Sequence, residues 1–143
     1  MKNNYETLEF PVIRQMIADR AMTSLAKMHI QALDVTEDSE EANEALKKVS
    51  CAMDMHRILG RLPLTPMDDI TLSLKKADMD GTLTCEELWN INSVLKNVKS
   101  LHNYFASFEG DLTAIRDEVE GLVGDDQLSN EIERCIEPDM RVS

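Results

Sequence analysis

The sequence has few residues that interrupt helices and few aromatic side chains. Its 143 residues include only five Gly and four Pro, and aromatic residues make up 4%. Gly and Pro are the least favourable residues inside a helix, so their scarcity leaves long stretches over which a helix can continue. Leu, Ile, Val, Ala and nine Met must then pack the interior, which suits helices around one hydrophobic core. The hydrophobic share of 43% excludes wholesale disorder.

Basic residues are also scarce. Lys and Arg number 15 against 27 Asp and Glu, which gives a formal net charge of −12. Contacts with phosphates need Lys and Arg to displace condensed counterions, so this balance disfavours direct, unassisted binding to nucleic acid. We interpret the acidic excess as surface charge that keeps the protein soluble. The alternative is that the acidic residues form a docking face for a basic partner.

Cysteine pairs, a secretion signal and a membrane-length apolar run are all absent. Cys51, Cys85 and Cys135 lie far apart without a CxxC pair, and we expect three buried, reduced thiols. The first ten residues lack an apolar signal-peptide core, and no run approaches the ~20 apolar residues that cross a bilayer. The sequence therefore predicts a cytoplasmic protein with no membrane-spanning segment.

Motifs for catalysis and nucleotide binding are missing as well. There is no Gly-rich phosphate loop ending in Lys-Ser/Thr, no HExxH and no GxSxG. His29, His56 and His102 are distant in sequence from the cysteines, and no nucleophile is marked beside a base. His56 falls on an apolar helix stripe, which predicts a packed or hydrogen-bonded core histidine. We therefore assign no catalytic, cofactor-binding or metal residue and predict that the chain itself is not an enzyme.

The sequence does contain apolar side chains at helical spacing. Pro11 is suited to the first turn of one helix, and Thr23 or Ser24 can cap the next. The clearest helix begins at Ser39 and ends before Gly60. Its predicted core-facing stripe consists of Ala42, Ala45, Leu46, Val49, Met53, His56 and Leu59.

Similar stripes continue towards the end of the chain. They predict a short helix capped by Asp68 or Asp69, a long helix through Leu88 to Phe105, and two more over 112–122 and 128–136, with Pro138 closing the last. Only residues 140–143 could begin a strand. The predicted fold is all-α: an irregular bundle of about six or seven amphipathic helices that forms a single domain, or part of one, over residues 1–143.

Residues 76–87 resemble a calcium-binding EF-hand loop. Asp78 and Asp80 fall at loop positions three and five, and Glu87 falls at position twelve. Position one needs an oxygen ligand, but it holds Lys76, a cation that would repel calcium. A calcium site formed by Asp78, Asp80 and Glu87 is therefore the weaker interpretation.

Residues 76–87 also have a structural interpretation, which we prefer. Gly81 would supply a turn conformation closed to other residues. Thr84 and Glu87 fit an S/T-x-x-E capping box at the start of the long helix. On this interpretation Gly81, Thr84 and Glu87 are structural residues, and no metal is bound.

Four blocks in order resemble the N-terminal region of the second bacterial branch of the MutS superfamily. They are Thr7-Leu8-Glu9-Phe10, Asp69-Ile70, Gly81-Thr82-Leu83-Thr84-Cys85-Glu86-Glu87-Leu88, and Glu131-Ile132-Glu133-Arg134-Cys135-Ile136. Their order and spacing fit from Leu8 to the last residue, so the resemblance covers nearly the whole chain.

The resemblance implies part of a longer cytoplasmic protein. Members of that branch are homodimers in which an N-terminal core, or lever, region with clamp helices leads to an ATPase domain that uses ATP and Mg, and then to a nuclease-like Smr domain. They are associated with branched-DNA binding, suppression of homologous recombination and rescue of collided ribosomes. This sequence stops before the clamp helices, phosphate loop and Smr region. No ATP or DNA contact is therefore transferred to its residues, and its partners are expected to be the remaining domains of the parent chain.

Two functions from different classes follow from the sequence. The first is a non-catalytic structural coupling element of such an ATPase, reaching DNA or the ribosome only through the parent protein. The alternative is a free-standing helical protein-binding module that responds to calcium through residues 76–87.

Overall fold

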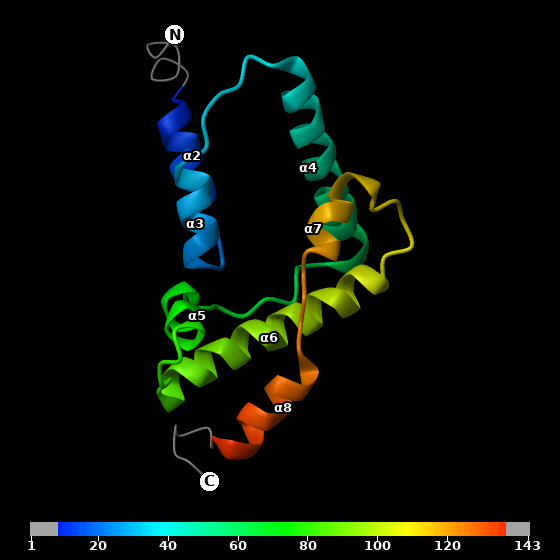
Figure 1. Cartoon of the computed structure of the whole chain (residues 1–143). Helices are drawn as coiled ribbons and strands as arrows, with labels where there is room; N and C mark the ends of the chain where they lie inside the picture. The colour runs from blue at the N-terminus through cyan, green and yellow to red at the C-terminus, as the bar shows by residue number, and fades with distance from the viewer. Residues whose placement is uncertain (1–8, 137–143) are drawn as a thin grey trace.

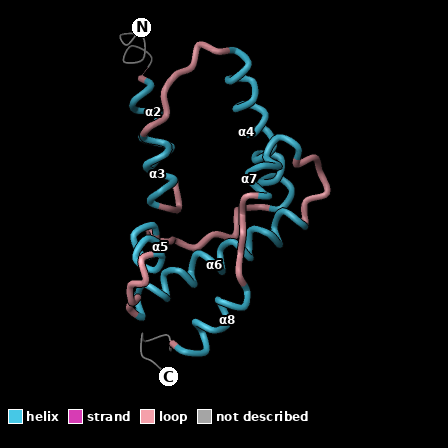
Figure 2. The backbone as a smooth tube through the Cα atoms, viewed as in Figure 1, coloured by secondary structure: helices cyan, strands magenta, loops and turns pink. Residues whose placement is uncertain are grey.

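The computed structural model describes residues 9–136, which form helices joined by loops (Figures 1 and 2). The only β interaction between described residues is an isolated bridge between Thr23 and Met67. The elements in chain order are α2 (Phe10–Ala18), α3 (Ser24–Gln31), α4 (Ser39–Leu59), α5 (Thr71–Asp78), α6 (Cys85–Ala106), the 3-10 turn η1 (Thr113–Ile115), α7 (Arg116–Glu120) and α8 (Asp126–Cys135). The all-α fold class is confirmed.

The boundaries of the longer helices are explained by their caps. Pro11 lies in the first turn of α2, where its missing N–H leaves no hydrogen bond unmade. The Thr23 side chain caps α3, and the Asp38 carboxylate caps α4 by accepting from the Glu40 and Glu41 amides. Gly60 ends α4 at φ 82°, a backbone angle that other residues rarely adopt.

The shorter helices depart from the sequence prediction. Residues 112–122 form only η1 and the five-residue α7 instead of one regular helix. Helix α5 begins at Thr71, whose backbone N–H donates to the Asp69 carboxylate, although Ile70 occupies the N-cap position. Pro138 and the strand suggested at 140–143 lie outside the described residues.

The buried side chains form two small clusters rather than one core. Cys51, Met55 and Phe108 pack where α4 meets the segment after α6. Ile91, Ile132 and Ile136 pack where α8 lies along α6. The main contacts between helices are those of α2 with α3, α6 with α8, and α4 with η1, and Tyr104 and Phe105 of α6 also pack against the cluster of α4. The expectation of a single core was wrong for residues 9–136, whose buried apolar side chains fall into these two clusters.

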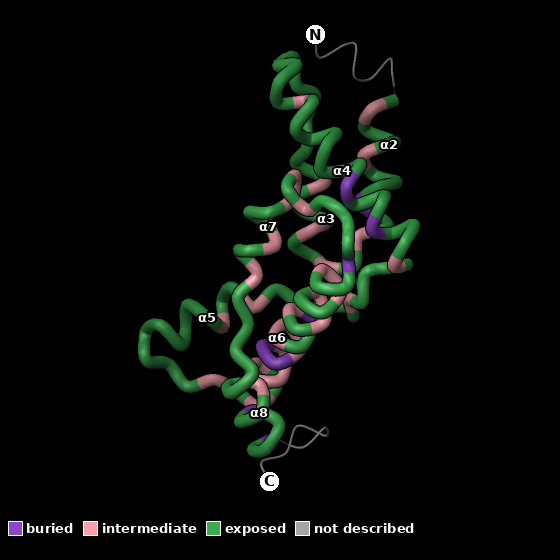
Figure 3. The backbone as a smooth tube through the Cα atoms, turned by 90° about the vertical axis from the view of Figure 1, so that its right-hand side faces the viewer, coloured by how far each residue is buried: buried purple, intermediate pink, exposed green. Residues whose placement is uncertain are grey.

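This pairwise packing leaves an open shape. The α2–α3 pair and α4 stand on opposite sides of Figure 1, with α6 running beneath them. The chain has an accessible surface of 10828 Å², whereas a compact monomer of 16.2 kDa has about 7,500 Å². Figure 3 shows few buried segments among the exposed ones. Much apolar surface is therefore left uncovered.

The apolar stripe of α4 faces away from the cluster that α4 helps to form. Leu46, Val49 and Met53 are 64%, 54% and 67% exposed, and His56 is also exposed. The buried residues of this helix are Cys51 and Met55, which lie on another face. The prediction of a core-facing stripe was wrong for Leu46, Val49 and Met53, although Leu59 at its end packs against the cluster. The prediction of a packed His56 was also wrong, because periodicity identifies an apolar face without identifying the neighbour that covers it.

The three cysteines differ in exposure. Cys51 is buried, Cys85 is half-buried and Cys135 is exposed, and none forms a disulfide. The prediction of burial therefore holds for Cys51 alone. Helix α8 packs on α6 through the face of Ile132 and Ile136, which turns Cys135 outward. Among the described helices, none combines the length and apolar character needed to cross a membrane.

Candidate functional site

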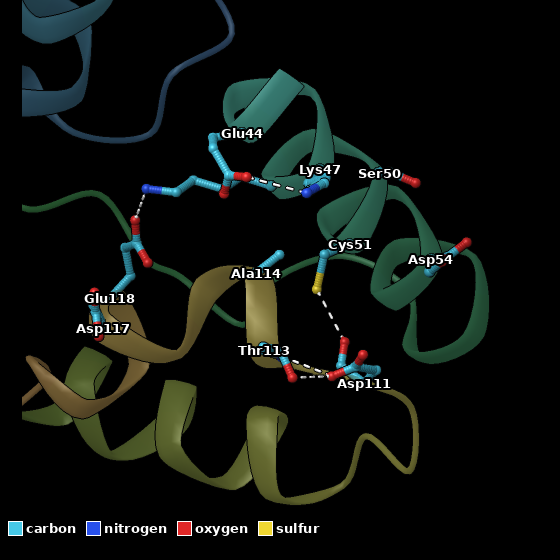
Figure 4. A pocket seen from close by; sticks show the side chains of 11 residues that line it. Glu44, Lys47, Ser50, Cys51, Asp54, Asp111, Thr113, Ala114, Asp117 and Glu118 are labelled. Carbon is cyan, nitrogen blue, oxygen red and sulfur yellow. Dashed lines mark hydrogen bonds and ion pairs between the residues drawn. The ribbon is translucent and has the colours of Figure 1, made fainter. Parts of the chain in front are cut away.

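A concave surface of about 680 Å³ lies between α4 and the η1–α7 segment (Figure 4). Helix α4 contributes Lys47, Lys48 and Cys51, and the other wall contributes Asp111 and Glu118. Lys48 and Glu118 form an ion pair across the groove, while Lys47 pairs with Glu44 on its own helix at 3.1 Å. The groove is therefore mainly polar, and it carries three further acids, Asp54, Asp111 and Asp117, beside these two ion pairs.

The thiol in this groove is buried and donates a hydrogen bond. Burial, and secondarily the negative charges of Asp111 and Asp54, raise the pKa of Cys51. The Cys51 thiol lies 3.5 Å from the backbone carbonyl oxygen of Asp111, to which it donates. A protonated thiol is a poor nucleophile and a poor metal ligand. Cys51 is therefore suited to packing rather than to catalysis.

The carboxylates of the groove are engaged by neighbouring side chains. Hydrogen bonds from the Thr113 hydroxyl and backbone N–H lower the pKa of Asp111. A hydrogen bond from Lys48 lowers the pKa of Glu118. The lining contains no imidazole to act as a base beside Cys51. The groove thus lacks the paired nucleophile and base that covalent catalysis requires.

A second, apolar cavity of about 350 Å³ lies between α4, α6 and α7. Met55 and His56 of α4, Phe105 of α6, and Val119 and Leu122 contribute to its lining. The size and apolar lining suit one large hydrophobic side chain. His56 therefore lines a cavity, whereas the sequence predicted a position in the core.

The calcium-like loop is closed by its own side chains. The Glu87 carboxylate accepts from the Thr84 backbone N–H at 2.7 Å, while the Glu87 N–H donates to the Thr84 hydroxyl at 3.1 Å, which completes a capping box on α6. Lys76 donates to both oxygens of Glu87, at 3.2 and 3.1 Å. The bond from Thr84 first, and then that from Lys76, lower the pKa of Glu87.

The acidic residues of the loop do not converge. Asp78 is the last residue of α5, Asp80 follows it in the turn, and Glu87 is engaged by Thr84 and Lys76. Among residues 9–136, no group of three or more His, Cys, Asp or Glu side chains is arranged to hold a metal ion. The structure thus does not bring the proposed ligands Asp78, Asp80 and Glu87 together.

Gly81 fits its position for a reason other than the one expected. The left-handed backbone conformation in this turn belongs to Asp80, at φ 59°, and not to Gly81. A Cβ atom at Gly81 would lie 2.7 Å from both the Lys76 carbonyl oxygen and the Lys76 Cγ. The expectation of a special φ at Gly81 was wrong, and close approach to the end of α5 is what excludes a side chain.

Two buried asparagines of α6 join segments that are distant in sequence, and sequence reasoning missed both. Asn97 accepts from the Thr65 backbone N–H at 2.9 Å and donates to the Thr65 carbonyl at 3.2 Å. Asn92 accepts from Ser129 at 2.6 Å and donates to Glu133 at 3.2 Å. A polar residue within a helix that otherwise packs apolar side chains was the available signal. These asparagines fix the connector and α8 on α6.

The described residues thus form an all-α segment with capped helices, a few contacts between helices and exposed apolar faces. Comparison with known proteins gives the particular relationship. The chain is 26% identical over 143 residues to endonuclease MutS2 of Leuconostoc mesenteroides, with 96% of this chain and 18% of that protein covered. It is 28% identical to endonuclease MutS2 of Ligilactobacillus salivarius over 99% of this chain and 18% of that protein.

The chain is also 27% identical to endonuclease MutS2 of Pediococcus pentosaceus, with 92% of this chain and 18% of that protein covered. No protein-family model matches the chain. The resemblance to the second bacterial branch of the MutS superfamily is thus confirmed over almost the whole sequence. The chain spans less than a fifth of the length of these relatives.

Proposed function

We propose that this chain is a non-catalytic helical core segment of a MutS2-like protein and serves as a structural coupling element between parts that carry the chemistry. The observation that carries the proposal is the uncovered apolar surface of capped, regular helices. Exposed apolar faces of this extent mark interfaces, since isolated soluble domains seldom leave them open. A segment that packs between other domains needs such faces and needs no reactive side chains.

The contacts within the chain suit a coupling role. Asn97 ties the connector at Thr65 to the middle of α6, and Asn92 ties α8 to the same helix. A displacement of α8 is therefore passed to α6 through hydrogen bonds and the Ile91 cluster. Helices linked in this manner move as units, which is how packed elements transmit a domain rotation.

For the parent protein we propose the activities that the resemblance implies. The parent would be a cytoplasmic homodimer with an ATPase that uses Mg, and an Smr domain as the candidate nuclease. It would bind branched DNA or collided ribosomes and suppress homologous recombination. This segment would contribute no direct nucleic-acid contact, since its net charge of −12 opposes phosphate binding.

A domain exchange tests the proposal. The matching segment of the Leuconostoc mesenteroides relative is replaced by this chain, and solubility, dimerisation and ATP hydrolysis of the chimera are measured. We expect the chimera to fold and to retain these properties, because the apolar faces would meet their usual neighbours. The control is the same exchange with the matching segment of the Pediococcus pentosaceus relative, and a second control deletes the segment.

The isolated chain provides the complementary measurement. We expect neither ATP turnover nor binding to branched DNA at physiological salt. A chimera that fails where the Pediococcus control succeeds would contradict the proposal. Such a failure together with a calcium-dependent interaction of the isolated chain would favour the free-standing module.

A further inference from the structure

Helix α8 lies along α6 and is held there by a mixture of apolar and polar contacts (Figure 1). Ile91 of α6 packs with Ile132 and Ile136 of α8. Nearer the start of α8, Lys99 Nζ lies 3.7 Å from Asp126 Oδ2. Both side chains of that ion pair are more than half exposed, so the pair contributes little. The apolar cluster therefore supplies most of the attraction between the two helices.

The apolar face of α6 does not by itself fix the position of α8 along it. Leu88, Ile91, Leu95 and Val98 follow one another at steps of three and four, and Leu88 and Leu95 pack against the isoleucine cluster. Such a row offers similar apolar contacts at successive helical turns, about 5.4 Å apart. The loop 121–125 before α8 contains two glycines and no regular structure, so it can follow a shift of that size. Apolar contacts alone thus allow more than one register.

Asn92 makes contacts that fit one register only. It is 1% exposed, its amide oxygen accepts from the Ser129 hydroxyl at 2.6 Å, and its amide nitrogen donates to Glu133 at 3.2 Å. Ser129 and Glu133 are one turn apart, so the amide is held between successive turns of α8. A slide of one turn puts Asp125 or Glu133 where Ser129 now stands. A carboxylate then replaces the hydroxyl that donates to the amide oxygen, which is unfavourable in a buried site.

The bonds of Asn92 are not needed to satisfy its partners. Ser129 is half-buried and Glu133 is exposed, so both can bond to water instead. Glu133 also pairs with Lys96. Leu at position 92 would therefore leave no buried polar group unpaired and would add apolar contact with the isoleucine cluster. A buried Asn that fixes the register of two helices without adding stability is a known arrangement in helix pairs.

We propose that Asn92 sets the register of α8 on α6, and that without it α8 moves between positions one helical turn apart. The inference concerns the α6–α8 contact of this chain and does not require a longer protein. One consequence rests on the proposed function: a coupling element passes on a displacement of α8 without slippage only while this register is fixed.

Methyl NMR of the isolated chain tests the proposal. The unchanged chain is expected to give one δ1-methyl signal each for Ile91, Ile132 and Ile136. Asn92→Leu is expected to give two signals or broadened signals for these methyl groups, because α8 then occupies more than one register. Its midpoint of urea unfolding is expected to equal or exceed that of the unchanged chain.

Asn97→Leu is the matched control. Asn97 is 3% exposed on the same helix, but it bonds to Thr65 and not to α8. This variant is expected to lower the urea midpoint, because it removes the partner of the Thr65 backbone, while Ile132 and Ile136 keep single signals. Circular dichroism should show both variants folded.

Spin labels measure the register itself. One label is attached to Cys135, which is exposed on α8, and the other to Asn103→Cys at an exposed position of α6, with Cys51 and Cys85 changed to Ala. One distance is expected between the labels in this chain. Adding Asn92→Leu is expected to produce a second distance that differs by up to about 5 Å, the rise of one helical turn.

An exchange of groups across the interface supplies a rescue. Asn92→Asp alone sets a carboxylate against Glu133 and is expected to multiply or broaden the isoleucine signals. Together with Glu133→Gln, the new carboxylate can accept from both the Ser129 hydroxyl and the new amide. Single signals are then expected to return, which a merely destabilising pair of substitutions would not produce.

Three results would each overturn the proposal. Single signals and a single distance with Asn92→Leu would show that the apolar contacts fix the register. A fall in the urea midpoint as large as that of Asn97→Leu would show that Asn92 serves stability instead. Multiple signals that persist when Asn92→Asp is combined with Glu133→Gln would show that the two bonds do not select the register. These measurements use the isolated chain, so this proposal and the domain exchange can fail independently.

Discussion

Lys76 Nζ lies 3.1 Å from Glu87 Oε2, so the first and last residues of the calcium-like loop are bonded to each other. The ammonium group stands at the loop position where a calcium site would need an oxygen ligand. Glu87 uses the same oxygen to accept from the Thr84 backbone N–H. The loop therefore joins α5 to the capping box of α6 through side chains of its own.

This geometry predicts that calcium has no effect on the loop. Adding calcium should leave the fluorescence of Trp89 and the midpoint of thermal unfolding unchanged. Glu87→Gln should lower that midpoint equally with and without calcium, because it removes the charge paired with Lys76. Thr84→Ala should lower stability by about 1 kcal/mol through loss of the cap. A fluorescence change on calcium addition that Glu87→Gln abolishes would support the metal site instead.

The second prediction concerns acid stability and Glu133. Hydrogen bonds from Lys96 first, and then from Asn92, lower the pKa of Glu133 below the ordinary value of 4.5. A lowered carboxyl pKa means that this group stabilises the folded state above about pH 4.5, and that the contribution is lost as pH falls through the folded pKa. Glu133→Gln should therefore lower the unfolding midpoint at pH 7, with a difference from the unchanged chain that shrinks in acid.

Glu131→Gln is the matched control for this measurement. Glu131 pairs with Arg134 one turn away on the exposed face of α8, where ion pairs contribute little. Its substitution should change the midpoint less than Glu133→Gln at pH 7. A Glu133→Gln effect that stayed constant down to pH 3 would contradict the role assigned to its charge.

Local signals in the sequence predicted the helices, whereas their tertiary contacts were not predictable from it. Thr23 and Thr84 act through adjacent backbone groups, so their caps could be read from a few residues. Which face of α4 is buried depends on η1 and α7, which lie more than 50 residues later in the sequence. The apolar residues on the exposed face of α4 are also more regularly spaced than those on its buried face. Asn97 bonds to Thr65 across 32 residues, so its polar side chain within the helix could signal a buried hydrogen bond but not its partner.

The third prediction tests that long-range bond. Asn97 is buried and both its amide oxygen and its nitrogen bond to the Thr65 backbone, so Asn97→Ala leaves that backbone N–H and C=O without these partners. The expected loss of unfolding free energy is about 1–3 kcal/mol, measured by urea denaturation. Asn103→Ala, at an exposed position of the same helix, should change it by less than about 0.5 kcal/mol. Equal losses of unfolding free energy in the two variants would show that the hydrogen bonds between Asn97 and Thr65 do not stabilise the fold.

The fourth prediction concerns thiol reactivity. Cys135 is exposed, whereas Cys51 is buried with a raised pKa. Reaction with a disulfide reagent depends on both access and the thiolate fraction, so Cys135 should react fastest and Cys51 slowest. Chains that keep one cysteine each, with the other two changed to Ser, allow the rates to be compared at pH 8. Unfolding in urea should remove the difference, and a fast Cys51 in the folded chain would show that the α4 cluster opens readily.

The last prediction compares two methionines on α4. Met55 is 4% exposed in the cluster with Cys51 and Phe108, whereas Met53, two residues earlier, is 67% exposed on the stripe. Truncation of a buried methionine removes packed atoms and leaves a cavity, so Met55→Ala should lower the unfolding free energy by about 2–5 kcal/mol. Met53→Ala should change it by less than about 0.5 kcal/mol. Both variants keep the helix propensity of Ala, so urea denaturation measures the contribution of each face. If Met53→Ala destabilised the isolated chain as much as Met55→Ala, the apolar stripe of α4 would already be covered in solution.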